Sequence, residues 1–79
     1  MLETKNIIRT STGKIRFDLF IENNRSEQPD VKVLYDPDNG KITVDKTLDY
    51  SRKSYVRKAI RKLKSFAPNY PNCFKMVWY

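Results

Sequence analysis

The segment "RKSYVRKAIRKLK", positions 52–64, contains seven basic side chains and no acidic one. Lysine ammonium and arginine guanidinium groups bind anions, and the planar arginine fork matches a phosphate or a carboxylate with two parallel hydrogen bonds. The basic residues are Arg52, Lys53, Arg57, Lys58, Arg61, Lys62 and Lys64. The chemistry that these residue types offer is therefore the binding of an anion.

The net charge of +7 is concentrated in the C-terminal part of the chain. Positions 1–49 hold eight Lys or Arg and nine Asp or Glu, whereas positions 50–79 hold eight Lys or Arg and no acidic residue. Because the excess belongs to one segment, it predicts a polyanionic partner that binds at one place.

The chain has few of the residue types that catalysis and metal binding usually require. The chain has no histidine, the commonest general base and metal ligand, and Cys73 is its one cysteine. The turn "DPDNG" at positions 36–40 resembles the start of a calcium loop, but its glycine comes one position early. We expect a protein that is not an enzyme and that holds no metal and no cofactor. The lone cysteine and the lack of a long apolar run predict a reducing, cytoplasmic setting.

Alternation of apolar and polar residues predicts four strands in the first half of the chain. The expected strands are 5–10, 14–22, 31–35 and 41–44. Gly13 and the "DPDNG" segment supply the turn residues of two hairpins.

Residues 49–66 change to helical periodicity. Apolar or aromatic side chains recur three and four positions apart, at Tyr55, Val56, Ala59, Ile60, Leu63 and Phe66. Asp49 or Ser51 can cap the start of this helix, and Pro68 is expected to end it.

The last segment, "CFKMVWY" at positions 73–79, reads as a fifth strand. Both of its faces are largely apolar, so we expect it either at the centre of the sheet or covered by a second subunit in a homodimer. The predicted fold is one small α+β domain over residues 1–79. Its antiparallel sheet consists of two hairpins plus the C-terminal strand, and one amphipathic helix packs on one face, in the order ββββαβ.

The basic helix face has an ordinary explanation, because runs of charge are usually just solvated. Solvated helices, however, normally mix signs, and here Lys58–Lys62 and Arg57–Arg61 are like-charge pairs four residues apart. Arg52 also lies in the first turn, where the helix dipole disfavours a cation. Together these effects forgo about 1–2 kcal/mol of helix stability, which suggests an external anion.

A second candidate surface lies on the other face of the sheet. Its residues are Lys14, Arg16, Phe20, Lys32 and Lys41. An aromatic ring among cations could stack on an unpaired base. Acidic residues are interleaved on the same face, and cross-strand ion pairing is the preferred interpretation.

These observations predict a nucleic-acid-binding protein that contacts the phosphates of DNA or RNA largely without regard to sequence. Arg57, Lys58, Arg61 and Lys64 are expected to contribute most of the affinity, with Lys53 and Lys62 beside them. The alternative is a small interaction protein, such as the inhibitors found in phages and mobile elements, that docks on an acidic or nucleic-acid-binding surface of another protein. A membrane partner is not expected, because the apolar stripe of the helix is needed for the core.

Overall fold

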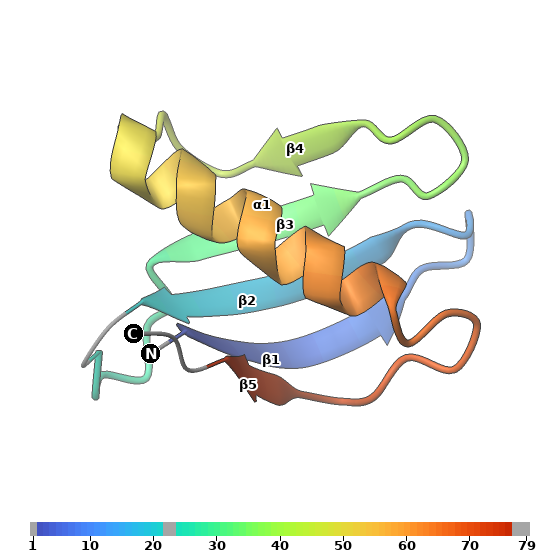
Figure 1. Cartoon of the computed structure of the whole chain (residues 1–79), viewed down its shortest axis with the longest axis horizontal. Helices are drawn as coiled ribbons and strands as arrows, with labels where there is room; N and C mark the ends of the chain where they lie inside the picture. Colours follow the sequence, from blue (N-terminus) through green and yellow to red (C-terminus); the bar gives the residue numbers. More distant parts are fainter. Residues whose placement is uncertain (1, 22–23, 77–79) are drawn as a thin grey trace.

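Among the residues that the structure describes, five strands form one antiparallel sheet, and a single helix crosses one face of it diagonally (Figure 1). In the computed structural model, which describes residues 2–21 and 24–76, the strands lie in the order β4-β3-β2-β1-β5. The elements are β1 (Leu2–Arg9), β2 (Ile15–Ile21), β3 (Val31–Tyr35), β4 (Ile42–Val44), α1 (Tyr50–Lys64) and β5 (Phe74–Met76). The predicted α+β class and the ββββαβ order are confirmed.

Strand β2 lies at the centre of the sheet, and its alternating residues Ile15, Phe17 and Leu19 are buried on one face. On the side that faces the helix, its buried residues are paired across to buried residues of β3. The opposed pairs are Ile15–Tyr35, Phe17–Val33 and Leu19–Val31. This register gives the helix a continuous apolar floor on which to pack.

Glycine at both hairpin turns adopts a backbone conformation that other residues rarely take. Gly13 has φ +83° in the β1–β2 turn, and Gly40 has φ +74° in the β3–β4 turn. Each turn is closed by a backbone hydrogen bond, from the amide of Thr10 to the carbonyl of Lys14 at 2.8 Å and from Asp36 to Lys41 at 2.9 Å.

Strand β1 contains a bulge that the sequence did not predict. Its register with β2 shifts between Lys5 and Ile8, and Asn6 has φ +56°. Strict alternation would put residues 2, 4, 6 and 8 on one face. The bulge instead buries Ile7 and leaves Ile8 58% exposed.

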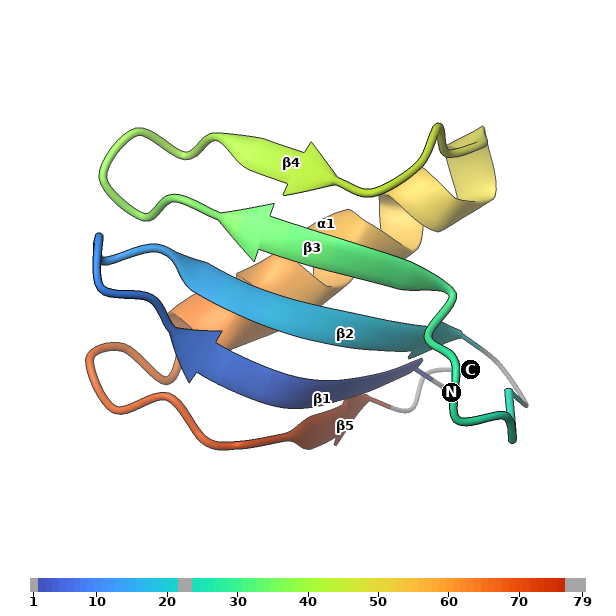
Figure 2. The same cartoon turned by 180° about the vertical axis from the view of Figure 1, so that it is seen from behind.

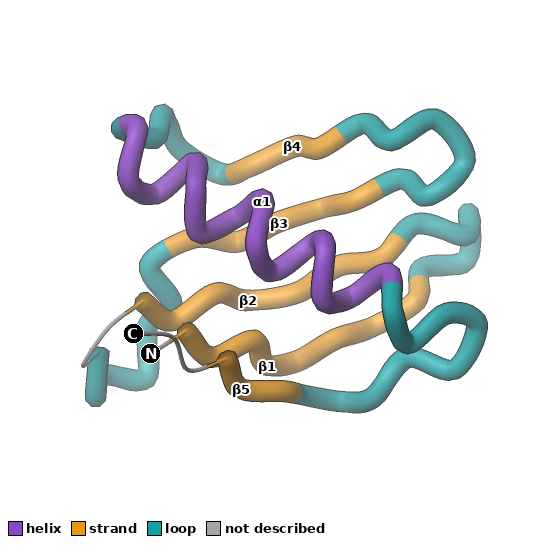
Figure 3. The backbone as a smooth tube through the Cα atoms, in the orientation of Figure 1, coloured by secondary structure: helices purple, strands orange, loops and turns teal. Residues whose placement is uncertain are grey.

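The helix packs on the sheet through a single stripe of four buried side chains, Val56, Ala59, Ile60 and Leu63. Figure 3 shows α1 in front of the strands, and Figure 2, seen from behind, shows that the opposite face of the sheet has no helix over it. The two faces of the sheet therefore have different roles: one forms the core and the other faces outward.

The helix is slightly shorter than expected. It begins at Tyr50 and ends at Lys64, and the residues after it form tighter turns, with the amide of Phe66 bonded to the carbonyl of Leu63 at 3.1 Å. The peptide bond between Ala67 and Pro68 is cis. Phe66 is thus outside the helix, where its ring lies 5.4 Å from that of Phe74.

The expectation that the last strand could be central in the sheet is wrong. Strand β5 is an edge strand that pairs only with β1, with Phe74 opposite Thr4 and Met76 opposite Leu2. Phe74 and Met76 are partly buried against the core, and Lys75 points to the other face. The remainder of the predicted strand, residues 77–79, lies outside the described residues.

Candidate nucleic-acid interface

The basic segment forms helix α1, and Asp49 caps its first turn. Asp49 has extended backbone angles, and its carboxylate accepts a hydrogen bond from the amide of Arg52 at 2.8 Å. Of the two caps that the sequence suggested, Asp49 and Ser51, the structure selects Asp49. This cap fixes where the helix starts and hence which way each basic side chain points.

The apolar stripe and the cations occupy different sides of α1. The apolar stripe faces the sheet. The helix has fifteen residues and is therefore about 22 Å long. The exposed cations are Arg52, Lys53, Arg57, Arg61, Lys62 and Lys64, and Lys58 is half-buried. The structure therefore places the seven predicted binding residues on one helix, six of them exposed and Lys58 half-buried.

Few acidic side chains lie near the basic side chains of α1. Nη1 of Arg52 lies 2.9 Å from Oδ2 of Asp49, an exposed pair at the very start of the helix. Within residues 2–21 and 24–76, no carboxylate lies within 4.0 Å of the charged nitrogens of the other exposed cations. These are Lys53, Arg57, Arg61, Lys62 and Lys64.

Three lysines of α1 lie near aromatic rings. Nζ of Lys62 is 5.5 Å from the ring centroid of Phe66, and Nζ of Lys64 is 5.8 Å from that of Tyr35. Lys58 lies at 5.8 Å from the ring of Tyr55. A ring orients a cation without neutralising its charge, so Lys62 and Lys64 can still bind an anion.

The carboxylates of the first half are used elsewhere, mostly in holding loops to strand ends. Asp30 accepts a hydrogen bond from the amide of Ile21 at 2.7 Å, and Asp45 accepts one from the amide of Lys32 at 3.0 Å. Asp36 accepts another inside the β3–β4 turn at 2.9 Å. These three carboxylates therefore serve the backbone of the sheet, and none of them pairs with Lys53, Arg57, Arg61, Lys62 or Lys64.

The second candidate surface is only partly assembled. Arg16, Phe20 and Lys32 lie on the sheet face opposite the helix, and Lys14 and Lys41 lie just outside the strands at the two hairpin turns. Phe20 is only 6% exposed. Its ring therefore offers little area on which a base could stack.

Ion pairs on this outer face centre on Glu3. The ammonium of Lys5 lies 3.0 Å from one oxygen of Glu3, and that of Lys75 lies 3.9 Å from the other. Lys5 is also 4.9 Å from the ring centroid of Phe20. Mixed charges and a covered ring distinguish this face from the outer side of α1.

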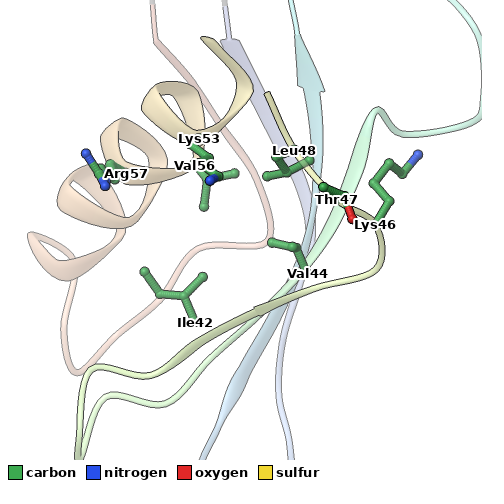
Figure 4. Close-up of a pocket in the computed structure, with 8 residues that line it drawn as sticks. All are labelled: Ile42, Val44, Lys46, Thr47, Leu48, Lys53, Val56 and Arg57. Atoms are coloured by element: carbon green, nitrogen blue, oxygen red, sulfur yellow. The ribbon is translucent and has the colours of Figure 1, made fainter. Parts of the chain in front are cut away.

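A cavity of about 300 Å³, which the sequence did not predict, lies between β4 and the first half of α1 (Figure 4). Figure 4 shows Ile42, Val44, Leu48 and Val56 turned toward the cavity, and Lys46 turned away from it. The full lining is Ile42, Val44, Lys46, Thr47, Leu48, Lys53, Val56 and Arg57. Leu48, an isolated apolar residue in a polar connection, is the one signal of this site in the sequence.

Two further classes of site can be assessed on the described part of the chain. Residues 2–21 and 24–76 hold no group of three or more His, Cys, Asp and Glu side chains placed to bind a metal ion. The helix of that region lacks the length and apolar character of a membrane span.

Comparisons of the chain with protein-family models, with curated proteins and with solved structures find no match in any of the three.

Proposed function

We propose that this protein binds nucleic acid through phosphate contacts made by the outer side of α1. The observation that supports this most strongly is the row of exposed cations that lack a carboxylate neighbour among the described residues. A row of like charges without internal compensation is disfavoured unless an external anion offsets it.

A phosphate backbone suits the spacing of these cations. Residues four apart on a helix are separated by about 6 Å along its axis, and a nucleic-acid strand presents a regular row of single negative charges. Arg57 and Arg61 are four residues apart on the exposed side, and Lys64 follows three residues later, about 4.5 Å farther along the axis. Each phosphate that they neutralise releases condensed counterions, which favours binding.

The contributions of the seven cations are expected to differ. Arg57, Lys58, Arg61 and Lys64 carry most of the affinity, with Lys53 and Lys62 beside them. Arg52 contributes less, since its guanidinium already pairs with Asp49.

A gel-shift panel of single- and double-stranded DNA and RNA tests the proposal. The variant is Arg57→Glu with Arg61→Glu, which should abolish the shift while circular dichroism shows that the fold is kept. The control is Arg9→Glu with Arg25→Glu, which makes the same change of charge at two exposed positions outside α1 and outside the second candidate surface. Equal loss in both variants would mean that net charge alone, and not α1, governs binding.

A further inference from the structure

Strand β4 is an edge strand whose outer backbone groups meet no partner among the described residues. The amide of Asp45 bonds to the carbonyl of Lys32 at 3.2 Å, and the amide of Asp36 bonds to that of Lys41 at 2.9 Å. Because hydrogen-bonded and non-hydrogen-bonded pairs alternate in an antiparallel ladder, the backbone groups of Ile42 and Val44 point away from β3. Figure 1 shows β4 as the outermost strand at this side of the sheet.

The same two residues form the apolar floor of the cavity beside α1. Ile42 and Val44 are opposite the core residues Tyr35 and Val33, so their side chains lie on the helix side of the sheet. Ile42 is nevertheless 42% exposed. An apolar side chain and a free strand edge are thus presented together, at one place.

The charged residues that line this cavity are basic. Lys53 and Arg57 line it from the helix, and Lys46 belongs to the connection that follows β4. Among the residues that the structure describes, no Asp or Glu lines the cavity. A ligand here should therefore combine an apolar group with flanking negative charges.

We propose that the β4 edge binds an extended acidic peptide segment of another protein, which adds a sixth strand to the sheet. One apolar side chain of the segment fills the cavity, and acidic residues two positions before and after it lie on the same face, toward Lys53 and Arg57. The backbone of Ile42 and Val44 supplies the hydrogen bonds of strand addition.

Other occupants fit these observations less well. A lipid or a nucleic acid has no peptide backbone to pair with the edge. A second copy of this chain, paired β4 to β4, would bring two sets of Lys46, Lys53 and Arg57 together. The acidic peptide satisfies the edge, the cavity and the charge at once. It shares Lys53 and Arg57 with the proposed nucleic-acid surface, whereas the strand edge and the cavity play no part in that proposal.

The test uses a fluorescent peptide, Ser-Glu-Thr-Leu-Thr-Glu-Ser, and anisotropy at physiological salt. Its leucine and both glutamates share one face of an extended strand. An isomer of equal composition, Ser-Glu-Leu-Thr-Thr-Glu-Ser, puts the leucine on the opposite face. Two further versions of the first peptide carry N-methyl groups on every second backbone amide, one version on the odd-numbered and one on the even-numbered residues. Each version therefore lacks the hydrogen-bond donors along one edge of the extended peptide.

The first peptide should bind at least tenfold more tightly than its isomer, and one N-methylated version should lose binding while the other keeps it. Ile42→Glu should weaken binding at least tenfold, whereas Thr43→Glu, which adds the same charge on the opposite face of β4, should change it less than threefold. No binding at about 1 mM peptide would overturn the proposal. Equal affinity for the two isomers would do so as well, since it would mean that charge attraction alone holds the peptide.

Discussion

The carboxylate of Asp49 accepts two hydrogen bonds from Arg52, one from its backbone amide at 2.8 Å and one from its guanidinium at 2.9 Å. The acidic group nearest the basic segment in sequence is therefore used to start the helix and to pair its first cation. It does not reach the cations farther along α1, which is what leaves them available to an external anion.

Replacing Asp49 with Ala should lower the free energy of unfolding by about 1 kcal/mol, because the first turn loses its cap. Asp49→Asn keeps an oxygen that can accept the amide hydrogen bond of Arg52, so it should cost far less. Urea unfolding followed by circular dichroism measures both. Equal losses in the two variants would show that the exposed ion pair, rather than the cap, stabilises the helix.

Arg57→Glu should raise the free energy of unfolding by about 0.5–1 kcal/mol. Residue 57 lies four residues from both Lys53 and Arg61. The substitution therefore turns two repulsive like-charge pairs into two attractive pairs of opposite charge. Arg57→Gln only removes the charge, so its free energy of unfolding should lie between those of the wild type and Arg57→Glu. Added salt should shrink the gain, since these pairs are exposed.

The same Arg57→Glu variant should bind nucleic acid more weakly than the wild type. A more stable protein with weaker binding is the combination expected if the cations are kept for a partner. If Arg57→Glu were less stable than the wild type and bound nucleic acid equally well, the proposal that the cations of α1 serve a partner would be contradicted.

Thr4→Val should raise the free energy of unfolding by about 1 kcal/mol. Thr4 is fully buried, and its hydroxyl has no hydrogen-bond partner within the described part of the chain. Valine has nearly the same shape without the cost of an unpaired hydroxyl. Thr4→Ser, which keeps the hydroxyl and removes the methyl group, should instead be destabilising. A loss of stability in Thr4→Val would mean that the hydroxyl is satisfied in solution.

Asn6→Ala should be more destabilising than Asn6→Gly, by about 1 kcal/mol. Asn6 has φ +56°, where glycine is unstrained and alanine is not. Both variants lose the 2.9 Å hydrogen bond from the Asn6 side chain to Oδ2 of Asp18, so their difference isolates the backbone term. Urea unfolding of the pair gives this difference, and equal stability would argue against a positive φ at this position.

Much of this fold could be predicted from the sequence because its signals are local. The alternation in Ile15, Phe17 and Leu19, the glycine turns and the helical stripe each depend on neighbouring residues. The position of β5 in the sheet does not depend on neighbouring residues alone. The apolar pattern of a short strand fits an edge position and a central position equally well. Its pairing with β1 depends on contacts across the whole chain.

The candidate site divides in the same way. The cations of α1 could be located by counting, since helical spacing alone puts Arg57 and Arg61 on one side. The burial of Phe20, the bulge at Asn6 and the cavity beside Ile42 could not. Each arises where two separated segments meet, and no single stretch of sequence encodes it.

The most direct test of the central claim is the affinity for a nucleic acid as a function of salt concentration. With six phosphate contacts along α1, the logarithm of the association constant should fall against the logarithm of salt with a slope of about −5 for duplex DNA or about −4 for a single strand. Arg57→Glu with Arg61→Glu should make that slope shallower by about 2, if any binding is left to measure. Absence of binding at low salt, or a slope that is the same in the double variant, would contradict the assignment of α1 as a phosphate-binding surface.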